Sequence, residues 1–246
     1  MALRLAILEL PACWNDPSRM LAEAEFLLAQ APADLALFPE ASLTGYVSTE
    51  GDTDLRARAE PLDGPLSAAL AAMAKRVGMV LAAPLIERHG DRFANAFVVI
   101  GPKGERLAHY RKRHPWVVER WATPGRLPYP SFWLGELRFT LAICYDLHFL
   151  GWEAAKLLEQ SDVLLFPSAW VEEPDLREER FVALARRFRV IVANANWGVG
   201  APVVQGQGRS IVVSAEGEVL ARMPPLCVGV GGRLDVVLGE SLARPR

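Results

Sequence analysis

Two residues that could perform acid–base or nucleophilic chemistry stand directly after short apolar runs. Glu40 follows 35–38 and a proline, and Cys144 follows 139–143. Ligands of α/β proteins bind outside the carboxyl ends of strands, so polar residues at such positions are well placed to act on a ligand. A half-buried glutamate suits a general base near neutral pH. A cysteine in a turn before a helix can act as a nucleophile beside backbone N–H groups that bind an oxyanion.

Each candidate also has an inert interpretation when it is considered alone. Most glutamates are exposed to solvent, and free cysteine is among the most buried residue types. Lys112 lies in the basic run 109–114, which is typical of a solvated surface or a phosphate-binding patch. The function therefore cannot be assigned from any one of them, and their order and local context have to be considered together.

Several other kinds of site lack their sequence signals. The chain contains no Gly-x-Ser-x-Gly, Cys-x-x-Cys or His-Glu-x-x-His, so neither a serine-hydrolase elbow nor a metal site is indicated. His109 and His114 precede Cys144, which reverses the papain-like order, although chain order alone does not settle geometry. The glycines of 229–232 lack the strand–turn–helix context of a dinucleotide loop, so we expect a turn near the final strand there.

Composition sets limits on the class of protein. The 246 residues are 51% hydrophobic, and without a visible linker they are expected to form a single domain over 1–246. A net charge of -2 argues against a general nucleic-acid binder and gives no electrostatic reason for membrane binding. Three sparse cysteines fit a reducing compartment. Because there is also no signal-peptide pattern or transmembrane run, we expect a soluble, cytoplasmic protein.

The spacing of apolar residues predicts strands that alternate with helices. Strands are expected at 3–10, 34–38, 79–84, 94–100, 106–110, 139–143, 162–166, 190–195, 210–214 and 218–222. Helices are expected at 17–30, 66–77, 152–159 and 173–188, with Asp16 as an N-cap and Gly78 as a stop. This alternation predicts an α/β architecture with parallel and antiparallel strand neighbours.

The phrases around the three candidates resemble the motifs of the nitrilase superfamily, also called the carbon–nitrogen hydrolases. Phe38–Ala41 with Leu43–Tyr46 resembles the glutamate motif, Tyr110–His114 the lysine motif and Ile143–Leu147 the cysteine motif. Further matching phrases, in chain order, are Glu119 with Thr123–Gly125, Leu165–Trp170, Ala195–Asn196 with Gly198, Gly208–Ser210 and Gly217–Ala221. The matches extend over residues 3–223, and the cysteine phrase is most similar to the amidase-like branch.

This resemblance implies a four-layer α-β-β-α sandwich of mixed sheets and a homodimer formed through the helices near the cysteine. It implies Cys144 as the nucleophile, Glu40 as the general base, Lys112 and the backbone N–H of Tyr145 as the oxyanion donors, and Glu119 as an orienting group. The implied reaction hydrolyses a small non-peptide amide through a thioester, releases ammonia and a carboxylate, and uses no metal or organic cofactor. An N-carbamoyl hydrolase, a nitrilase and a catalytically silent binding protein are the alternatives.

Two places depart from the family pattern. The Arg-Phe-Pro-Glu phrase that usually follows the cysteine is replaced by 148–151, which includes His148, Leu150 and Gly151, and the usual Glu-Asn pair of a later helix is replaced by Arg187-Phe188. These differences concern the substrate pocket and the dimer contact rather than the reaction class. The tail after residue 237 is also shorter than in many relatives.

The pocket is expected to include Trp116, His148 and Trp170. The two tryptophans favour an apolar or flat acyl group, although tryptophans also pack protein cores. His148 could bind a substrate carboxylate or make a structural hydrogen bond. The sequence therefore leaves the substrate open.

Overall fold

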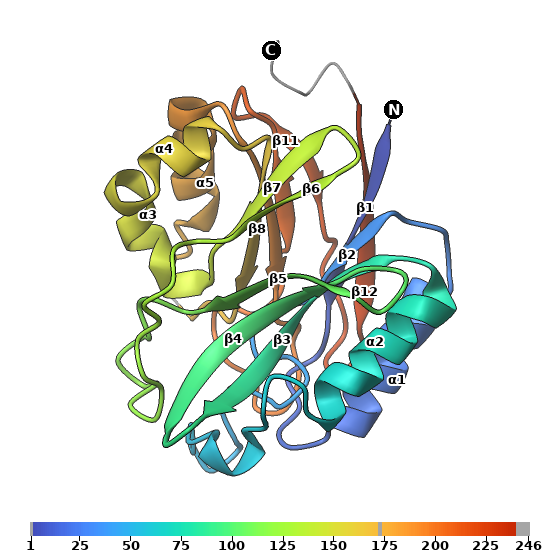
Figure 1. Cartoon of the computed structure of the whole chain (residues 1–246), viewed down its shortest axis with the longest axis vertical. Coiled ribbons are helices and arrows are strands. Elements are labelled where there is room, and N and C mark those ends of the chain that lie inside the picture. The colour runs from blue at the N-terminus through green and yellow to red at the C-terminus, as the bar shows by residue number, and fades with distance from the viewer. Residues whose placement is uncertain (1, 172–173, 240–246) are drawn as a thin grey trace.

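The computed structural model describes residues 2–171 and 174–239, and in this part of the chain twelve strands form two six-stranded sheets. The sheets lie in the middle of the molecule, with helices on both outer sides (Figure 1). The predicted α/β class and the four-layer α-β-β-α sandwich of mixed sheets are confirmed by this arrangement.

The first sheet has a parallel centre and antiparallel edges. Its order is β12 (Gly232–Leu238), β1 (Leu3–Glu9), β2 (Leu35–Leu37), β3 (Val80–His89), β4 (Arg92–Ile100) and β5 (Arg106–Arg111). Strands β1, β2 and β3 pair in parallel, whereas β12, β4 and β5 pair antiparallel with their neighbours. The carboxyl ends of β2 and β5 deliver two of the candidate residues, Glu40 and Lys112.

The second sheet repeats this plan. Its order is β11 (Val219–Arg222), β10 (Ile211–Val213), β9 (Ile191–Asn196), β8 (Val163–Ser168), β7 (Leu137–Leu141) and β6 (Ser131–Leu134). Strands β7, β8 and β9 are parallel, and Cys144 follows the carboxyl end of β7. Every residue of β8 and β9 is buried, as expected for parallel strands covered on both faces.

Each sheet has its own helices. Helices α1 (Pro17–Leu28) and α2 (Pro65–Val77) cover the first sheet, while α3 (Leu147–Glu153), α4 (Ala155–Glu159) and α5 (Arg177–Phe188) lie beside the second (Figure 1). The Asp16 side chain caps α1 by accepting from the Arg19 backbone N–H at 3.0 Å. Gly78 ends α2 in the left-handed conformation, with φ of 67°.

Three local expectations differ from the structure. The helix expected at 152–159 begins instead at Leu147 and breaks at Ala154, whose φ of -118° and ψ of 13° interrupt the helical path. The strand β6 was not expected, because it is a short edge strand in which burial does not impose an apolar pattern. Helix α5 begins at Arg177, and the start of the helix expected at 173–188 lies outside the described residues.

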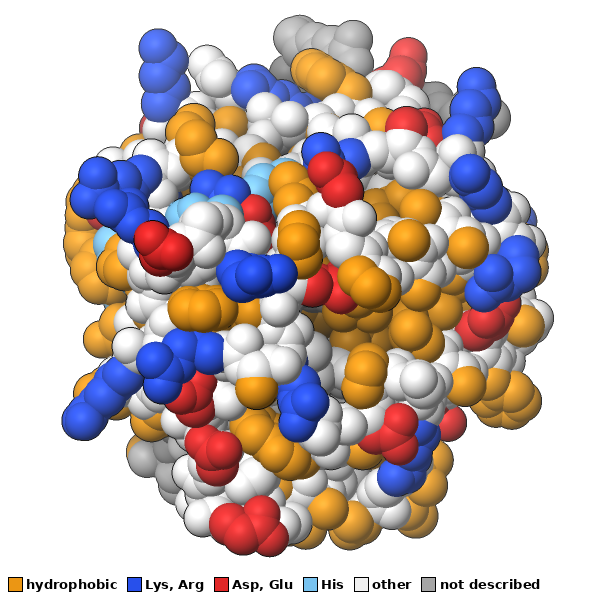
Figure 2. All heavy atoms as spheres, turned by 60° about the horizontal axis from the view of Figure 1, so that its bottom comes forward, with side chains coloured by type: hydrophobic (Ala, Val, Ile, Leu, Met, Phe, Trp, Pro, Cys, Tyr) orange, Lys and Arg blue, Asp and Glu red, His pale blue; other side chains and the backbone are white. Residues whose placement is uncertain are grey.

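Charged side chains of both signs lie on the face shown in Figure 2. Basic and acidic side chains are interspersed there rather than gathered into one continuous basic area. Within residues 2–171 and 174–239, none of the helices is long and apolar enough to cross a membrane.

Candidate active site

The structure brings the four charged or nucleophilic candidates into one place. Glu40, Lys112 and Glu119 are at most 2% exposed, and Cys144 is 8% exposed. Glu40 and Lys112 follow strands of the first sheet, whereas Cys144 follows a strand of the second. The cluster therefore lies where the carboxyl ends of strands from both sheets meet.

Lys112 is paired with both carboxylates. Its Nζ lies 2.6 Å from Glu40 Oε1 and 2.6 Å from Glu119 Oε2. Fully buried ion pairs of this kind require further hydrogen bonds to the remaining oxygens. Glu40 Oε2 accepts from the Ala169 backbone N–H at 2.9 Å, and Glu119 Oε1 accepts from the Asn95 side chain. Glu119 Oε2 also accepts from the Trp116 backbone N–H, in addition to Lys112. Both carboxylates are thus fixed in position and accept several donors each.

Asn95 is a site residue that the sequence reasoning missed. Its Nδ2 donates to Glu40 Oε1 at 2.8 Å and also to Glu119 Oε1. The side chain therefore bridges the two carboxylates, and it shares Glu40 Oε1 with the Lys112 ammonium. The sequence signal for this role was a polar residue, Asn95, between apolar residues of strand β4. A buried amide needs hydrogen-bond partners, so such a residue indicates a polar contact.

The charges in the cluster set the protonation of the lysine. Burial lowers the pKa of the Lys112 ammonium, but the nearby Glu119 and Glu40 carboxylates outweigh it and raise the pKa above its ordinary value. Burial likewise raises the pKa of Glu119, although Lys112 opposes the change. Lys112 is therefore a permanent cation, suited to stabilising negative charge and unsuited to acting as a base.

Cys144 sits in a constrained turn. Its φ is 44°, a left-handed conformation that is uncommon for residues other than glycine, and it opens the 3₁₀ helix Cys144–Asp146 that leads into α3. Burial, followed by the Glu40 carboxylate, raises the pKa of the thiol well above its ordinary value, against a smaller opposing effect of Lys112. The resting thiol is therefore protonated and needs a base at the moment of attack.

Asp146 fastens this turn to the loop that carries Lys112. Its fully buried carboxylate accepts from the Ile143 N–H at 3.0 Å, the Tyr110 hydroxyl at 2.7 Å and the His114 N–H at 3.0 Å. Burial raises its pKa to about 6, and these donors limit the rise. The sequence motif included Asp146, but only the structure gives it this bridging position.

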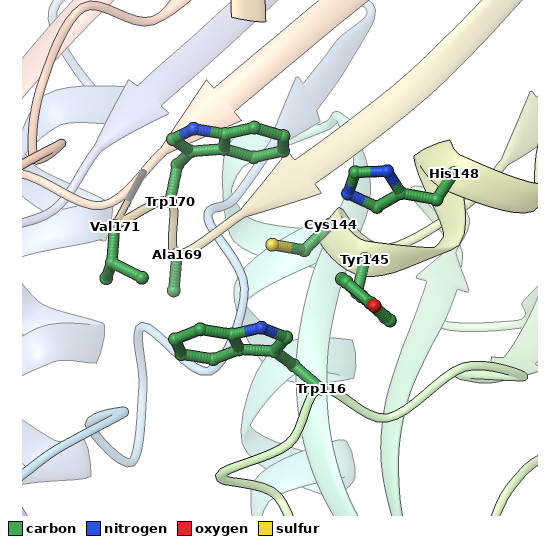
Figure 3. A pocket seen from close by; sticks show the side chains of 7 residues that line it. All are labelled: Trp116, Cys144, Tyr145, His148, Ala169, Trp170 and Val171. Carbon is green, nitrogen blue, oxygen red and sulfur yellow. The ribbon is translucent and has the colours of Figure 1, made fainter. Parts of the chain in front are cut away.

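A cavity of about 390 Å³ opens in front of Cys144. Trp116, His148 and Trp170, the three pocket residues expected from the sequence, all line it. The remaining lining residues are Cys144, Tyr145, Ala169 and Val171. Figure 3 shows the Cys144 sulfur directed into the space between the two indole rings. The thiol is thus accessible from the cavity, and the Glu40, Lys112 and Glu119 side chains are close enough to act electrostatically on it.

A metal-ion centre has little support in the described residues. They contain no group of three or more His, Cys, Asp or Glu side chains arranged to hold a metal ion. Between the Glu40 and Glu119 carboxylates, where a cation would bind, the Lys112 ammonium makes the contacts.

Two mixed sheets between outer helices, with these residues at their strand ends, define a nitrilase-like fold. A family model described as carbon–nitrogen hydrolase matches residues 4–226, so the chain belongs to the carbon–nitrogen hydrolase family of the nitrilase superfamily.

Individual relatives differ in their named activities. A nitrilase from Pyrococcus abyssi is 28% identical over 211 residues, which cover 84% of this chain and 79% of that protein. An (R)-stereoselective amidase from Pseudomonas sp. is 36% identical over 115 residues, or 46% of this chain and 40% of that protein. A solved structure of a mutant amidase from Nesterenkonia sp. AN1, carrying the acetamide moiety of fluoroacetamide on its active-site cysteine, matches with a TM-score of 0.81 and 23% identity, covering 97% of this chain and 91% of that chain.

Proposed function

We propose that this carbon–nitrogen hydrolase is an amidase that cleaves small non-peptide amides through a thioester on Cys144. The observation that carries the proposal is the buried cluster of Glu40, Lys112 and Glu119 beside a thiol that faces a cavity. The cluster supplies a base, a fixed cation and an orienting carboxylate beside one nucleophile. Acyl transfer to a thiol needs these components.

Acylation begins with the protonated thiol. Glu40 accepts the thiol proton as Sγ of Cys144 attacks the amide carbon, and the carbonyl π electrons move onto oxygen. The Lys112 ammonium and the Tyr145 backbone N–H stabilise this oxyanion; loss of one such donor typically costs about 10²–10³ in rate. Glu40 then protonates the leaving nitrogen, the carbon–nitrogen bond breaks and ammonia departs, which leaves a thioester.

Deacylation uses the same groups, with water as the nucleophile and the Cys144 sulfur as the leaving group. Glu40 removes a proton from water, the resulting hydroxide attacks the thioester carbon, and the oxyanion forms again beside Lys112. Collapse of this intermediate releases the carboxylic acid and returns the proton to the Cys144 sulfur. Because its pKa is raised, Lys112 keeps its charge throughout both halves. Glu119 orients Lys112 by the 2.6 Å ion pair.

The assignment of Glu40 rather than Glu119 as the base rests on two contrasts. Glu40 has the larger electrostatic effect on the Cys144 thiol of the two carboxylates. It also accepts from the Ala169 N–H, which comes from the same sheet as Cys144. Glu119 instead accepts from Trp116, three residues away in its own loop. Glu40 is therefore better placed for proton exchange with the nucleophile.

Ammonia release tests the proposal. The full-length protein is incubated with a panel of primary amides, N-carbamoyl compounds and nitriles, and ammonia and carbon dioxide are quantified. We expect ammonia without carbon dioxide from an amide, and an acyl adduct on Cys144 by mass spectrometry. Cys144→Ala should abolish turnover, while Cys227→Ala, at an exposed free cysteine, serves as the matched control and should retain it.

The alternatives correspond to other outcomes of this panel. Turnover of N-carbamoyl compounds with carbon dioxide release would identify a carbamoyl hydrolase, and turnover confined to nitriles would identify a nitrilase. Absence of turnover across all three classes, with the protein folded, would leave a catalytically silent binding protein. Full activity in Cys144→Ala would reject the thioester mechanism for any of these substrates.

A further inference from the structure

The cavity in front of Cys144 is larger than the reaction itself requires. Its volume of about 390 Å³ lies within the range of about 300–1,000 Å³ that is usual for pockets enclosing drug-sized ligands. The reacting amide group has only three heavy atoms, so most of the space must receive the acyl part of the substrate. The walls of this cavity therefore determine which acyl group fits.

Two indole rings form opposing walls. Trp116 comes from the loop between β5 and β6, Trp170 follows β8, and Figure 3 shows their rings on opposite sides of the space that the Cys144 sulfur faces. Flat faces on two sides accommodate a flat group better than a branched or puckered one, because aromatic rings gain from stacked or edge-on contact.

Both walls are held in place without a ligand. The Trp116 backbone N–H donates to the Glu119 carboxylate, and the Trp170 backbone N–H donates to Asn196 Oδ1 at 3.0 Å. The Arg180 guanidinium lies over the Trp170 ring, 5.9 Å from its centroid. The backbone that carries both rings is thus already ordered, so a ligand that enters between them loses little binding energy to ordering this backbone.

The described residues that line the cavity offer no fixed charge to an ionised acyl group. Among the described lining residues there is no Asp, Glu, Lys or Arg side chain. His148 Nδ1 lies 3.2 Å from Arg180 Nη1, and since a guanidinium can only donate, Nδ1 is the acceptor in this contact. An ionised group placed against these walls would lose hydration without a paired charge, which is costly.

We propose, building on the proposed amidase activity, that the preferred substrates are uncharged amides whose acyl group ends in a flat aromatic ring held between Trp116 and Trp170. The ring lies between the two indoles, and the amide carbon reaches Sγ of Cys144.

Phenylacetamide and cyclohexylacetamide provide a direct test. They have the same carbon skeleton, and a methylene group separates the ring from the reacting carbonyl in both, so their intrinsic reactivity is similar. One stacking contact corresponds to about a 2- to 12-fold gain in binding, so two contacts predict a preference for phenylacetamide in kcat/KM of about 5- to 150-fold. Succinamate, which ends in a carboxylate, should be poorer than both.

Leucine variants of the two tryptophans test whether these walls cause the preference for phenylacetamide. Trp116→Leu keeps an apolar side chain at a half-buried position and should reduce the preference by about 2- to 12-fold, because one of the two stacking walls is lost. Trp170→Leu should act in the same direction. Trp133→Leu is the matched control, since Trp133 is 58% exposed on β6 and is not among the residues that line the cavity. Its selectivity should equal that of the wild type.

The two proposals fail in different ways. If the wild type hydrolyses cyclohexylacetamide or succinamate as well as phenylacetamide, the aromatic-pocket proposal is overturned and the amidase activity stands. If no amide is hydrolysed, the amidase proposal fails. Calorimetric titration of Cys144→Ala with the same three compounds then still tests whether the cavity prefers an aromatic acyl group. Tighter binding of phenylacetamide that is lost in Cys144→Ala/Trp116→Leu supports the aromatic pocket, whereas equal binding of all three overturns it.

Discussion

Replacing Lys112 by methionine should destabilise the fold as well as abolish catalysis. Methionine retains a linear apolar stem but removes the ammonium, which lies 2.6 Å from a carboxylate oxygen of both Glu40 and Glu119. All three side chains are no more than 1% exposed, so water cannot replace the lost cation. Two buried carboxylates would remain together, with Asn95 and backbone N–H groups as their only polar partners in the described residues.

The expected loss is about 3–5 kcal/mol, the usual cost of removing one partner from a buried ion pair. The loss should depend on pH. Without Lys112, at least one carboxylate in the folded variant takes up a proton that it would release on unfolding, so the folded state binds more protons than the unfolded state. Its stability therefore falls as pH rises. The deficit relative to the wild type should be larger at pH 8 than at pH 5.

Urea unfolding followed by tryptophan fluorescence measures this effect at both pH values. Adding Glu119→Gln to Lys112→Met removes one of the two uncompensated charges and should recover about 1–3 kcal/mol, so the two substitutions are not additive. Lys103→Met, at an exposed position, is the control and should change stability by less than about 0.5 kcal/mol. A Lys112→Met protein that is as stable as this control at pH 8, or a double variant no more stable than the single one, would refute the proposed charge balance.

Three further predictions concern groups around the cluster. Since burial raises the pKa of Asp146 to about 6, above the ordinary value of about 3.9, its contribution is fully present below about pH 4 and is lost as pH rises through 6. The stability advantage of wild type over Asp146→Asn in urea unfolding should therefore shrink by up to about 3 kcal/mol between pH 4 and pH 7, and a constant difference would contradict this. The Tyr46 hydroxyl is buried with no hydrogen-bond partner in the described residues, so thermal melting should find Tyr46→Phe equally stable or up to about 1 kcal/mol more stable; a loss of 2 kcal/mol or more would contradict this interpretation. A Cβ at Gly125 would lie 2.1 Å from the Arg111 carbonyl oxygen, and the Gly125 N–H donates to the Lys112 carbonyl at 2.8 Å. Gly125→Ala should therefore cost about 1–3 kcal/mol in urea unfolding and reduce kcat/KM, and unchanged kinetics would show that Lys112 tolerates the shift.

Most strands could be predicted because burial on both faces leaves an uninterrupted apolar run in the sequence. Strand β8 is an example, and its expected and observed bounds agree to within two residues. The order of strands within the sheets did not follow from that periodicity, because it depends on pairings between distant segments. The layered arrangement was predicted instead from the resemblance of the motifs to those of the nitrilase superfamily. Strand β6 was missed because an edge strand with the exposed Trp133 lacks the apolar signal.

The sequence predicted those residues of the candidate site that belong to a recognisable motif. Glu40, Lys112, Cys144 and Glu119 each stood in a recognisable phrase, and the structure places them together. Asn95 was missed because its role depends on two carboxylates that are distant in sequence and adjacent only in the fold. The expected homodimer and cytoplasmic location stay predictions, and size-exclusion chromatography with light scattering would test the first.

The proposed catalytic residues come from both sheets, so stability and activity should be related through the packing between the sheets. Glu40 follows a strand of the first sheet, yet its Oε2 accepts from the Ala169 N–H of the second at 2.9 Å. The Tyr110 hydroxyl of the first sheet likewise donates to Asp146 beside the nucleophile. A small sliding of one sheet over the other would break these bonds while leaving each sheet intact. The distance between base and nucleophile therefore depends on packing between the sheets, and substitutions that loosen this packing should impair proton transfer before they unfold the protein.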